Sequence, residues 1–417
     1  MTIIQANKFY FPRWGADRYV FDLSAWLAAH GQTVIPFAMA HPDNFPTPFA
    51  RYFPSYVRTE RVDAREAARH PFDAGWQALR TAGRMAYSLE ARRKLAHLIA
   101  DTRPDVCHLH NVYTQISPSI LHTLHLQHVP TVMTVHDHHL VSPQYDRWAP
   151  GCGPDVQGMG VLSAAATRFH KHSYAASFLQ AAVFAFHRRL RLYERFVDFF
   201  LCPSASLAEA LKASGFPAHK IRVLSFGLDA SAIRPAYGTG RYVLFVGRFA
   251  AVKGPETLLD AARLLPWLSF RFVGAGPQEA ALKRLAQDMP NVAFAGYKTG
   301  AALEEEYAGA LAVAMPSRMR ETFGLVALEA MARGKPVLAS DAGALPEIVE
   351  DRFNGWLLPP LDVRAWAEAL QRIAVDEPFR SSLARHARET VERRFQAEEH
   401  WQRVLEAYRD AIDVHAS

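Results

Sequence analysis

Short apolar runs alternate with amphipathic segments along almost all of the 417 residues. This alternation is typical of parallel β-sheets covered by helices, because each parallel strand returns through a helix that packs on the sheet. In the first half we expect strands at 2–6, 33–39, 106–110, 131–136 and 199–204. In the second half we expect them at 242–247, 269–274, 291–296, 311–317, 336–340 and 355–359. The pattern predicts an α/β chain with two doubly wound units.

A segment rich in Gly, Pro, Ala and Ser, residues 227–241, separates the two strand series and is the expected interdomain linker. We therefore place an N-terminal domain at 1–224 and a C-terminal domain at 225–395. Apolar residues at helical spacing predict a closing helix at 396–417. We expect this helix to pack back on the N-terminal domain.

Composition and charge indicate where the protein is located and what kind of partner it has. No basic segment followed by an apolar run opens the chain, and no apolar run is long enough to span a bilayer. The three cysteines are widely spaced, so a reduced cytoplasmic location is expected. The net charge is +6, and counting along the sequence gives +8 for 1–224 and −2 for 225–417. The basic half suggests an anionic partner such as a membrane surface, a phosphorylated lipid or a nucleic acid, although a basic solvated surface explains it equally well.

Two cations follow the first strand of the second half. Arg248 comes directly after Gly247, and Lys253 precedes a helix that starts near Pro255. Cations at the carboxyl end of a parallel strand point into the crevice where such sheets bind ligands, so this pair can clamp a diphosphate. Two exposed loop residues are the plain alternative.

The next strand ends in a glycine pair, Gly274 and Gly276, followed by Pro277. Glycines allow a ligand to approach the backbone, and proline suits a first helical turn. A GxG pattern alone is a weak dinucleotide fingerprint.

Glu321 and Glu329 lie eight positions apart around an expected helix start. With Thr322 as the N-cap, the free helix amides that form an anion site are those of Phe323, Gly324 and Leu325. A carboxylate repels phosphate but accepts hydrogen bonds from sugar hydroxyls. The two glutamates are therefore predicted to bind hydroxyls on either side of a diphosphate. The alternative is a solvated loop residue and a surface helix residue, which the apolar neighbours of Glu329 disfavour.

Together, "VGRFAAVKG", "VGAGP", "PSRMRETFGLVALEAMARGKPVLASDAG" and "PEIVEDRFNGWLLPP" resemble the C-terminal domain of the family 4 retaining glycosyltransferases. The resemblance implies the GT-B fold, with two Rossmann-like domains facing each other across a cleft. It implies that Arg248 and Lys253 bind the donor diphosphate and that Glu329 binds the ribose. Glu321 and the amides after it would hold the transferred sugar and its phosphate.

The first half resembles the family more loosely. "RWGADRYV" stands where many members have Gly-Gly-Ala-Glu; Gly15 is kept, but Trp14 and Asp17 depart from the pattern. "TVMTVHDHHLVSP" matches a strand that ends in the family's cleft histidine, here His136. A metal bound by "HDHH" is conceivable, but adjacent residues of an extended strand face opposite ways. His136 is therefore expected to contact sugar or acceptor.

The resemblance predicts a retaining, hexosyltransferase-type enzyme that moves sugar from a UDP- or GDP-sugar to a hydroxyl of a lipid-linked or polysaccharide acceptor in cell-surface glycan synthesis. Stabilisation of the departing diphosphate should dominate catalysis, without a cofactor or an obligatory metal. The expected catalytic residues are His136, Arg248, Lys253 and Glu321. A basic, aromatic-rich segment at 167–196 suggests peripheral contact with the inner face of the plasma membrane, although an ordinary packed helix fits equally well.

Other classes remain open in principle. A nucleotide-sugar epimerase can share the two-domain fold and is the main alternative. A nicotinamide oxidoreductase is disfavoured, because no GxGxxG follows the first strand. A nucleic-acid-binding module is disfavoured because no recognition motif accompanies the basic half. An inactive scaffold is disfavoured by the complete set of cations and glutamates.

Overall fold

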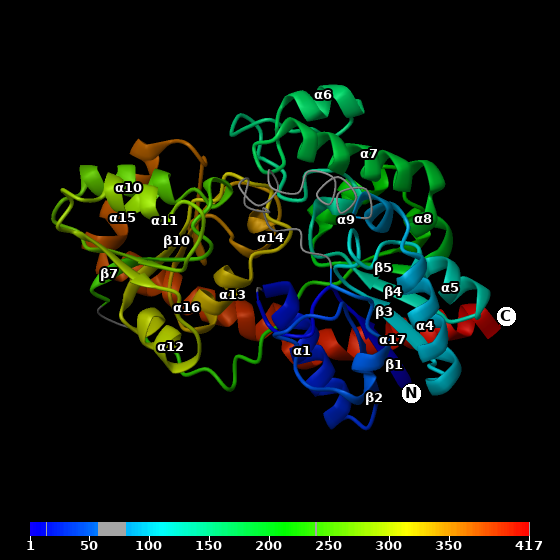
Figure 1. Ribbon diagram of the computed structural model, residues 1–417. Helices are drawn as coiled ribbons and strands as arrows, with labels where there is room; N and C mark the ends of the chain where they lie inside the picture. Colours follow the sequence, from blue (N-terminus) through cyan, green and yellow to red (C-terminus); the bar gives the residue numbers. More distant parts are fainter. Residues whose placement is uncertain (14, 57–80, 238–239, 417) are drawn as a thin grey trace.

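The computed structural model describes residues 1–13, 15–56, 81–237 and 240–416. Two lobes lie side by side, each a parallel six-stranded sheet flanked by helices (Figure 1). The first sheet has the order β2-β1-β3-β4-β5-β6. Its strands are β1 (Thr2–Ala6), β2 (Thr33–Phe37), β3 (Val106–Leu109), β4 (Thr131–Thr134), β5 (Phe199–Cys202) and β6 (Ile221–Val223). The order reverses between β1 and β3, and ligands bind at such a reversal in open α/β sheets.

The second sheet has the order β12-β11-β10-β7-β8-β9, with its reversal between β7 and β10. Its strands are β7 (Tyr242–Val246), β8 (Phe270–Val273), β9 (Val292–Gly296), β10 (Ala310–Met315), β11 (Val337–Ser340) and β12 (Gly355–Leu358). All eleven expected strands are present, with ends that differ by at most two residues. The sequence pattern missed β6, because this three-residue strand is only partly buried and carries Arg222.

The helices are divided between the two lobes. Those of the first lobe are α1 (Gly15–Ala29), α4 (Leu89–Thr102), α5 (Ile120–Leu126), α6 (Val161–Ala166), α7 (Tyr174–Leu190), α8 (Leu192–Phe196) and α9 (Ala205–Ala213). Those that follow β7 are α10 (Pro255–Leu264), α11 (Glu279–Leu285), α12 (Gly300–Ala308), α13 (Leu325–Ala332), α14 (Leu345–Ile348), α15 (Val363–Val375), α16 (Glu377–Arg394) and α17 (Ala397–Ala416).

Alternating strand residues feed two cores on opposite faces of the first sheet. Ile3 and Val132 pack with α1 and α17, whereas the neighbouring Ile4 and Met133 pack with α4 and α5. This period of two is the geometry of a strand buried on both faces. The core under α1 and α17 continues into the second lobe through α13 and α16. The two lobes therefore share one apolar core beside the site.

The chain passes between the lobes twice, near residue 228 and near residue 396, and these two segments lie side by side. Leu228, in the expected linker, donates its amide to Phe395 O at 2.8 Å and forms a parallel bridge with Gln396. Arg388 donates to the carbonyls of Ile233 and Ala230. The linker is thus packed against the junction of α16 and α17 along much of its length.

Helix α17, the red helix of Figure 1, packs against the first sheet. Its buried Tyr408 contacts residues of β1 and β3 in the first sheet. Gln5 Nε2 donates to Tyr408 Oη at 3.2 Å, and His108 Nδ1 lies 2.7 Å from the same hydroxyl. Trp26 donates to Glu398 at 2.8 Å, further along the same interface. These contacts hold the C-terminal helix on the N-terminal lobe.

The hydroxyl of Tyr408 supplies a testable prediction. Tyr408→Phe leaves buried polar atoms of Gln5 and His108 unpaired, which should cost about 1–3 kcal/mol and lower the melting temperature by a few degrees. Tyr193→Phe is the matched control, because the buried hydroxyl of Tyr193 has no hydrogen-bond partner among the described residues. Melting should be followed by circular dichroism, and equal shifts for the two variants would contradict this account.

Candidate active site

A cavity of about 280 Å³ lies where the carboxyl ends of the two sheets meet. Seven of the predicted site residues line it: Gly15, His136, Lys253, Glu321, Phe323, Gly324 and Leu325. They come from the start of α1, the end of β4, the turn after β7 and the segment after β10. Residues from both halves of the sequence are thus brought to one place, at the position where open α/β sheets bind ligands.

Glu321 is buried and bonded on several sides. Lys253 Nζ donates to its two carboxylate oxygens at 2.7 and 2.9 Å, and Ser317 Oγ donates to one of them. Its backbone is held by Ala344 N, which donates to Glu321 O at 2.9 Å. Gly343, at φ 63°, packs so closely that a Cβ there would lie 2.4 Å from Glu321 N. The groups predicted to hold sugar and diphosphate therefore bind each other, which satisfies a buried charge.

The helix after Glu321 begins two residues later than predicted. Thr322 is not its N-cap; the cap is Gly324, at φ 128°, a conformation suited to glycine. Thr322 is unavailable because its hydroxyl donates to His136 O at 2.9 Å. Ala327 N bonds Gly324 O, so the first free helix amides are those of Leu325 and Val326. The anion-binding end of α13 thus starts at Leu325, and the amide of Phe323 precedes it.

The segment that carries Glu321 is bonded directly to the first lobe. Arg320 N donates to Arg147 O at 2.8 Å, and His138 Nε2 lies 2.9 Å from Arg320 O. On the other side, Ser204 Oγ donates to Thr322 O at 2.8 Å. The position of Glu321 therefore depends on both lobes.

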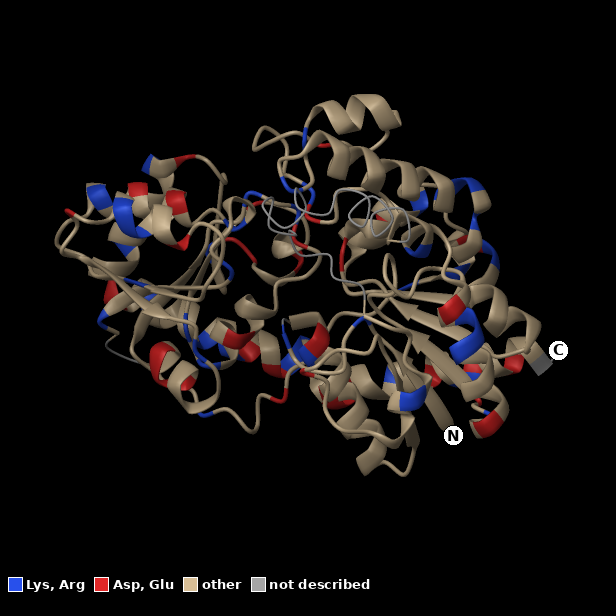
Figure 2. Cartoon of the chain, viewed as in Figure 1, with Lys and Arg blue, Asp and Glu red and all other residues tan. Residues whose placement is uncertain are grey.

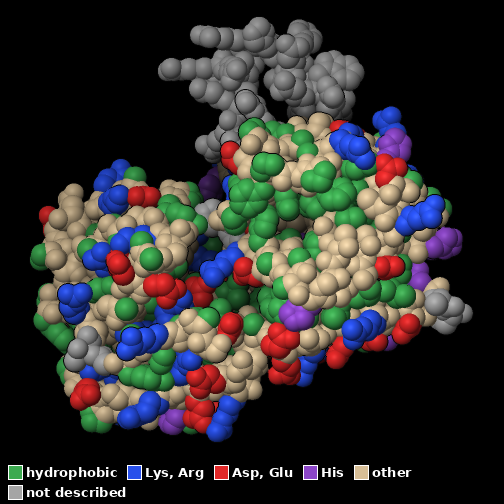
Figure 3. Space-filling model, turned by 90° about the horizontal axis from the view of Figure 1, so that it is seen from below, with side chains coloured by type: hydrophobic (Ala, Val, Ile, Leu, Met, Phe, Trp, Pro, Cys, Tyr) green, Lys and Arg blue, Asp and Glu red, His purple; other side chains and the backbone are tan. Residues whose placement is uncertain are grey.

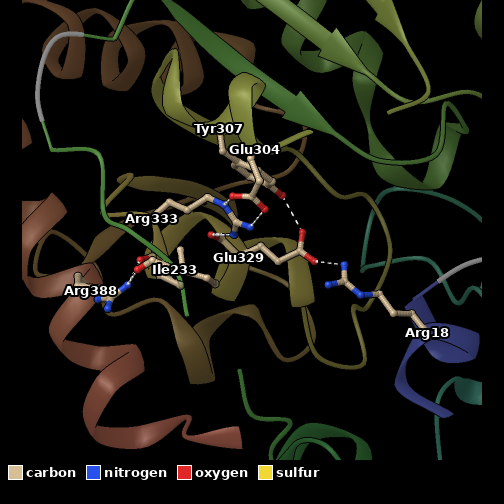
Figure 4. A network of polar contacts seen from close by, with 8 residues as sticks. Arg18, Ile233, Glu304, Tyr307, Glu329, Arg333 and Arg388 are labelled. Atoms are coloured by element: carbon tan, nitrogen blue, oxygen red, sulfur yellow. Dashed lines mark hydrogen bonds and ion pairs between the residues drawn. The ribbon is translucent and has the colours of Figure 1, made fainter. Parts of the chain in front are cut away.

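Glu329 is the fifth residue of α13 and lies about one turn from its start. Tyr307 Oη donates to one carboxylate oxygen at 2.8 Å, and Arg18 Nη1, from the other lobe, to the second at 3.3 Å (Figure 4). Arg333 extends this network by donating to Glu329 O and to Glu304. The Glu329 side chain is 18% exposed but that of Arg18 is 61% exposed, so a ligand hydroxyl can displace Arg18 at little cost.

The predicted glycines have two different roles. Gly15 lies against α13, where a Cβ would be 3.4 Å from Leu325 Cδ1. Gly274 and Gly276 pack on backbone instead: a Cβ would lie 1.9 Å from Gly247 O and 2.4 Å from Phe249 O, respectively. Pro277 lies outside the first helical turn, because α11 begins at Glu279. The GxG pattern thus joins two loops closely, and Gly276 also lines a second cavity.

His136 lines the 280 Å³ cavity and is backed by a chain of buried groups. Gln5, which donates to Tyr408, accepts from His110 Nε2 through its amide oxygen at 2.7 Å. His110 Nδ1 must then accept, and its partner at 3.0 Å is His136 Nε2. His136 Nδ1 is consequently the unprotonated nitrogen, able to accept from a sugar hydroxyl. Burial lowers the pKa of His136 to about 3, so the ring is neutral.

Arg248 lies apart from Lys253. It is exposed and lines a second cavity, of about 610 Å³, together with Gly276 and Pro277. Tyr145 lines the same cavity, and Asp146 lies near both cations: partial burial raises the pKa of its carboxyl, and the charges of Arg248 and Lys253 act in the opposite direction. Sequence reasoning missed Tyr145 and Asp146. Only their position in the loop after the strand that ends near His136 could have indicated them.

The "HDHH" segment separates its side chains. His138 bonds the backbone of Arg320, whereas His139 stacks on Tyr113 with ring centroids 4.4 Å apart. Asp137 accepts from His139 N at 2.8 Å. Within the ranges that the structure describes, no three His, Cys, Asp or Glu residues are arranged to hold a metal ion.

Comparison with protein families supplies the deciding observation. Residues 15–232 match the family described as Glycosyltransferase Family 4, and residues 229–390 match Glycosyl transferases group 1. The chain belongs to glycosyltransferase family 4. Its relatives include a sulfoquinovosyl transferase of Arabidopsis thaliana, 32% identical over 49% of this chain and 43% of that protein. A D-inositol 3-phosphate glycosyltransferase of Saccharomonospora viridis is 34% identical over 46% of this chain and 50% of that one. The matched regions thus span half or less of these relatives.

Solved glycosyltransferases share the fold of this family 4 chain over nearly its whole length. Sucrose-phosphate synthase from Thermosynechococcus elongatus superposes with a TM-score of 0.71 at 23% identity, covering 99% of both chains. Anabaena HepE in complex with UDP and glucose gives 0.65 at 18% identity, covering 97% and 98%. With two parallel sheets facing each other, the architecture is GT-B.

Asp137 of the family 4 chain provides a prediction about pH. Burial is the main cause that raises its pKa from 3.8 to about 7. Between pH 4 and 7 the folded chain therefore holds a proton that the unfolded chain has lost, and stability falls as the pH rises. Asp137→Asn can still accept from His139 N and should be more stable than the parent by roughly 1–2 kcal/mol at pH 8, with the gain vanishing near pH 4.

The measurement is urea unfolding of both proteins at pH 4.5 and pH 8. Asp413→Asn, at an exposed position of α17, serves as the control and should follow the parent at both values. Parallel curves for Asp137→Asn and the parent would contradict the proposed burial of the ionised carboxylate.

Proposed function

We propose that this chain is a retaining glycosyltransferase that moves a sugar from a UDP- or GDP-sugar to a hydroxyl of a glycan or lipid-linked acceptor in cell-surface glycan synthesis. One observation carries the proposal. Glu321 is held by Lys253 beside the free amides of α13, and Glu329 lies about one turn further along that helix. Hydroxyl acceptors thus flank an anion site, as a sugar diphosphate requires.

The charges of the site suit a departing diphosphate. As the anomeric bond breaks, negative charge grows on the phosphate oxygens, and preorganised donors that stabilise it lower the barrier. The Leu325 and Val326 amides, Lys253 and Arg248 are the proposed donors. Lys253 donates hydrogen bonds to Glu321, so a bound phosphate would compete with Glu321 for these donors. The carboxylate oxygens of Glu321 would then be free to accept from sugar hydroxyls. These cations take the place of a metal.

Retention is proposed to follow front-face attack. A double displacement needs a carboxylate nucleophile close to the anomeric carbon. Glu321 is the single carboxylate among the described residues that line the 280 Å³ cavity, and Lys253 and Ser317 already bind it. A phosphate oxygen of the leaving group would therefore take the proton of the attacking hydroxyl. His136, with Nδ1 free to accept, would orient a hydroxyl of the sugar.

Comparison with solved structures supports the donor class. Anabaena HepE has been crystallised with UDP and with UDP-glucose. The names of the relatives in Arabidopsis and Saccharomonospora likewise describe transfer of a sugar. These observations favour a transferase over an epimerase.

Binding of nucleotide diphosphates tests the proposal. At a concentration about 100 times its dissociation constant, the correct nucleotide should stabilise the fold by about 2.7 kcal/mol in a thermal-shift screen of UDP, GDP, their glucose conjugates and NAD. Glu329→Ala should weaken nucleotide binding about tenfold by removing the ribose acceptor. Glu321→Ala should leave nucleotide affinity within a few-fold but slow transfer about 100-fold.

Glu368→Ala, an exposed glutamate of α15, is the matched control and should change neither quantity. The absence of any shift with every nucleotide diphosphate would overturn the proposed donor class. Similar effects of Glu321→Ala and Glu329→Ala on binding and transfer would overturn their separate roles.

Peripheral membrane contact is proposed through α6 and α7. The basic segment expected at 167–196 is not one helix, since a turn precedes α7 and Arg191, at φ 51°, separates α7 from α8. Buried Glu194 neutralises part of its charge by pairing with Arg188 at 2.8 Å. Several large apolar side chains are nevertheless exposed there: Met159, Leu162, Tyr174, Phe178 and Phe186. Exposed apolar residues beside cations suit an anionic membrane surface.

Charge is distributed unevenly around the molecule. Basic residues lie along the ends of α7 and α8 (Figure 2). The face seen from below carries acidic and basic side chains interspersed (Figure 3). Within the described ranges, no helix is both long and apolar enough to cross a bilayer. The proposed contact is therefore peripheral and made by the α6–α7 edge.

Flotation with phosphatidylglycerol-containing liposomes at low salt tests this contact. Association should fall several-fold for Phe178→Ser combined with Leu162→Ser, because the apolar surface that enters the interface is lost. Val375→Ser, an exposed apolar position of α15, is the control. Absence of flotation by the parent protein would remove the membrane proposal.

A further inference from the structure

The 610 Å³ cavity is larger than the one beside Glu321 and lies between the lobes. Its first-lobe wall comes from the loops after three adjacent strands: Lys8 and Arg13 after β1, Asn111 after β3, and Asp137 after β4. Arg248 and Pro277 form part of the opposite wall. Both lobes therefore line this cavity.

Basic groups outnumber acidic groups in the cavity. Lys8, Arg13, Lys171 and Arg248 line it, whereas the acids are Asp17 and Asp137. Asp17 is already engaged, because Asn7 Nδ2 donates to it at 2.9 Å. The pKa of Asp137 is raised to about 7, chiefly by burial, so near neutral pH this carboxyl is only partly ionised. The cavity thus carries a net positive charge.

Histidines do not alter this balance. His139 and His170 also line the cavity, and burial lowers their pKa values to about 3 and about 4. Both rings are neutral at physiological pH and can donate or accept hydrogen bonds. The positive charge is therefore that of the lysines and arginines.

Neither Lys8 nor Arg13 forms an ion pair with a carboxylate of the described residues. Both cations instead lie over the ring of Phe9, at 5.0 and 4.8 Å from its centroid. Burial and the neighbouring Arg13 lower the pKa of Lys8 to about 8. The two adjacent cations repel each other, and Asp17, which acts to raise the pKa of Lys8, offsets this repulsion only in part. An anionic ligand would therefore stabilise the pair.

The two cavities differ in how their cations are paired. In the 280 Å³ cavity, Lys253 donates to Glu321, and the free amides at the start of α13 can bind phosphate. Lys8 and Arg13 line the other cavity, with Asn111 beside them. The Asn111 Oδ1 atom is buried and has no hydrogen-bond partner in the described part of the chain, so a ligand hydroxyl could donate to it. This wall therefore offers contacts for an anion and for a hydroxyl.

On the basis of the proposed transferase function, we propose that the 610 Å³ cavity binds the acceptor through a phosphate group, which Lys8 and Arg13 hold while Asn111 accepts from an acceptor hydroxyl. Charge-assisted bonds from a lysine and an arginine suit phosphate, since the guanidinium presents paired donors. The same phosphate chemistry occurs in a soluble phosphate monoester and in a phosphorylated lipid head group. The acceptor class is thus a phosphorylated alcohol.

Calorimetric titration of the full chain saturated with UDP tests the proposal, because UDP then occupies the anion site at Lys253 and α13, and added phosphate must bind elsewhere. The probes are inorganic phosphate, glycerol 3-phosphate and uncharged glycerol. We expect both phosphates to bind and glycerol not to bind. Lys8→Met and Arg13→Gln should each weaken phosphate binding at least tenfold while leaving UDP affinity within twofold. Lys283→Met and Arg263→Gln, on exposed helix surfaces of the second lobe, should leave phosphate binding unchanged.

A vesicle arm separates the two sources of phosphate. Phosphatidylcholine vesicles with and without phosphatidic acid are sedimented with the UDP-bound protein and its variants. Binding that needs both phosphatidic acid and Lys8 supports a lipid head group, whereas Lys8-dependent binding of glycerol 3-phosphate alone supports a soluble acceptor. If UDP binds but phosphate does not, or if Lys8→Met and Arg13→Gln bind phosphate like the parent, this inference is overturned. Failure of UDP itself to bind would instead overturn the donor proposal.

Discussion

The site depends on the backbone hydrogen bonds that attach residues 318–322 to the first lobe. Arg318 O accepts from Ala149 N, Arg320 N donates to Arg147 O, and Trp148 and Met319 form an antiparallel bridge. Backbone bonds of this kind, partly buried, fix position more firmly than exposed side-chain contacts do. Glu321 lies within this segment, so the backbone bonds that join the lobes also hold the residue whose carboxylate binds Lys253.

The shared apolar core supports the same arrangement. Aromatic rings run from Tyr19 through Phe226 and Phe323 to Phe395, with successive centroids 4.7, 5.1 and 6.0 Å apart. Phe323 is part of this series and also lines the 280 Å³ cavity. Packing between the lobes and the shape of the anion site are therefore set by the same residues. A change in the interlobe angle would alter both.

The two cavities differ in how their charged side chains are paired. In the smaller one, a buried carboxylate and a lysine satisfy each other, and helix amides provide the remaining positive potential. In the larger one, Lys8 and Arg13 lie over an aromatic ring with no carboxylate at ion-pair distance in the described ranges. Neutral histidines line the first-lobe side of both cavities, so they offer hydrogen bonds there without adding charge. Without a ligand, the charges of the smaller cavity are paired, whereas the larger cavity keeps a net positive charge.

Sequence alone predicted the α/β pattern and eleven strands, because burial on both faces of a parallel sheet imposes apolar runs that can be read locally. It also singled out seven residues that the structure brings to one cavity, since residues at the carboxyl ends of parallel strands converge. Tertiary structure decided which groups these residues contact. Thr322 does not cap the helix, because its hydroxyl donates to His136 O, and Glu329 accepts from Arg18, 311 positions away. The short strand β6 and the position of Lys8 and Arg13 over the ring of Phe9 likewise depend on distances between segments that no local pattern encodes.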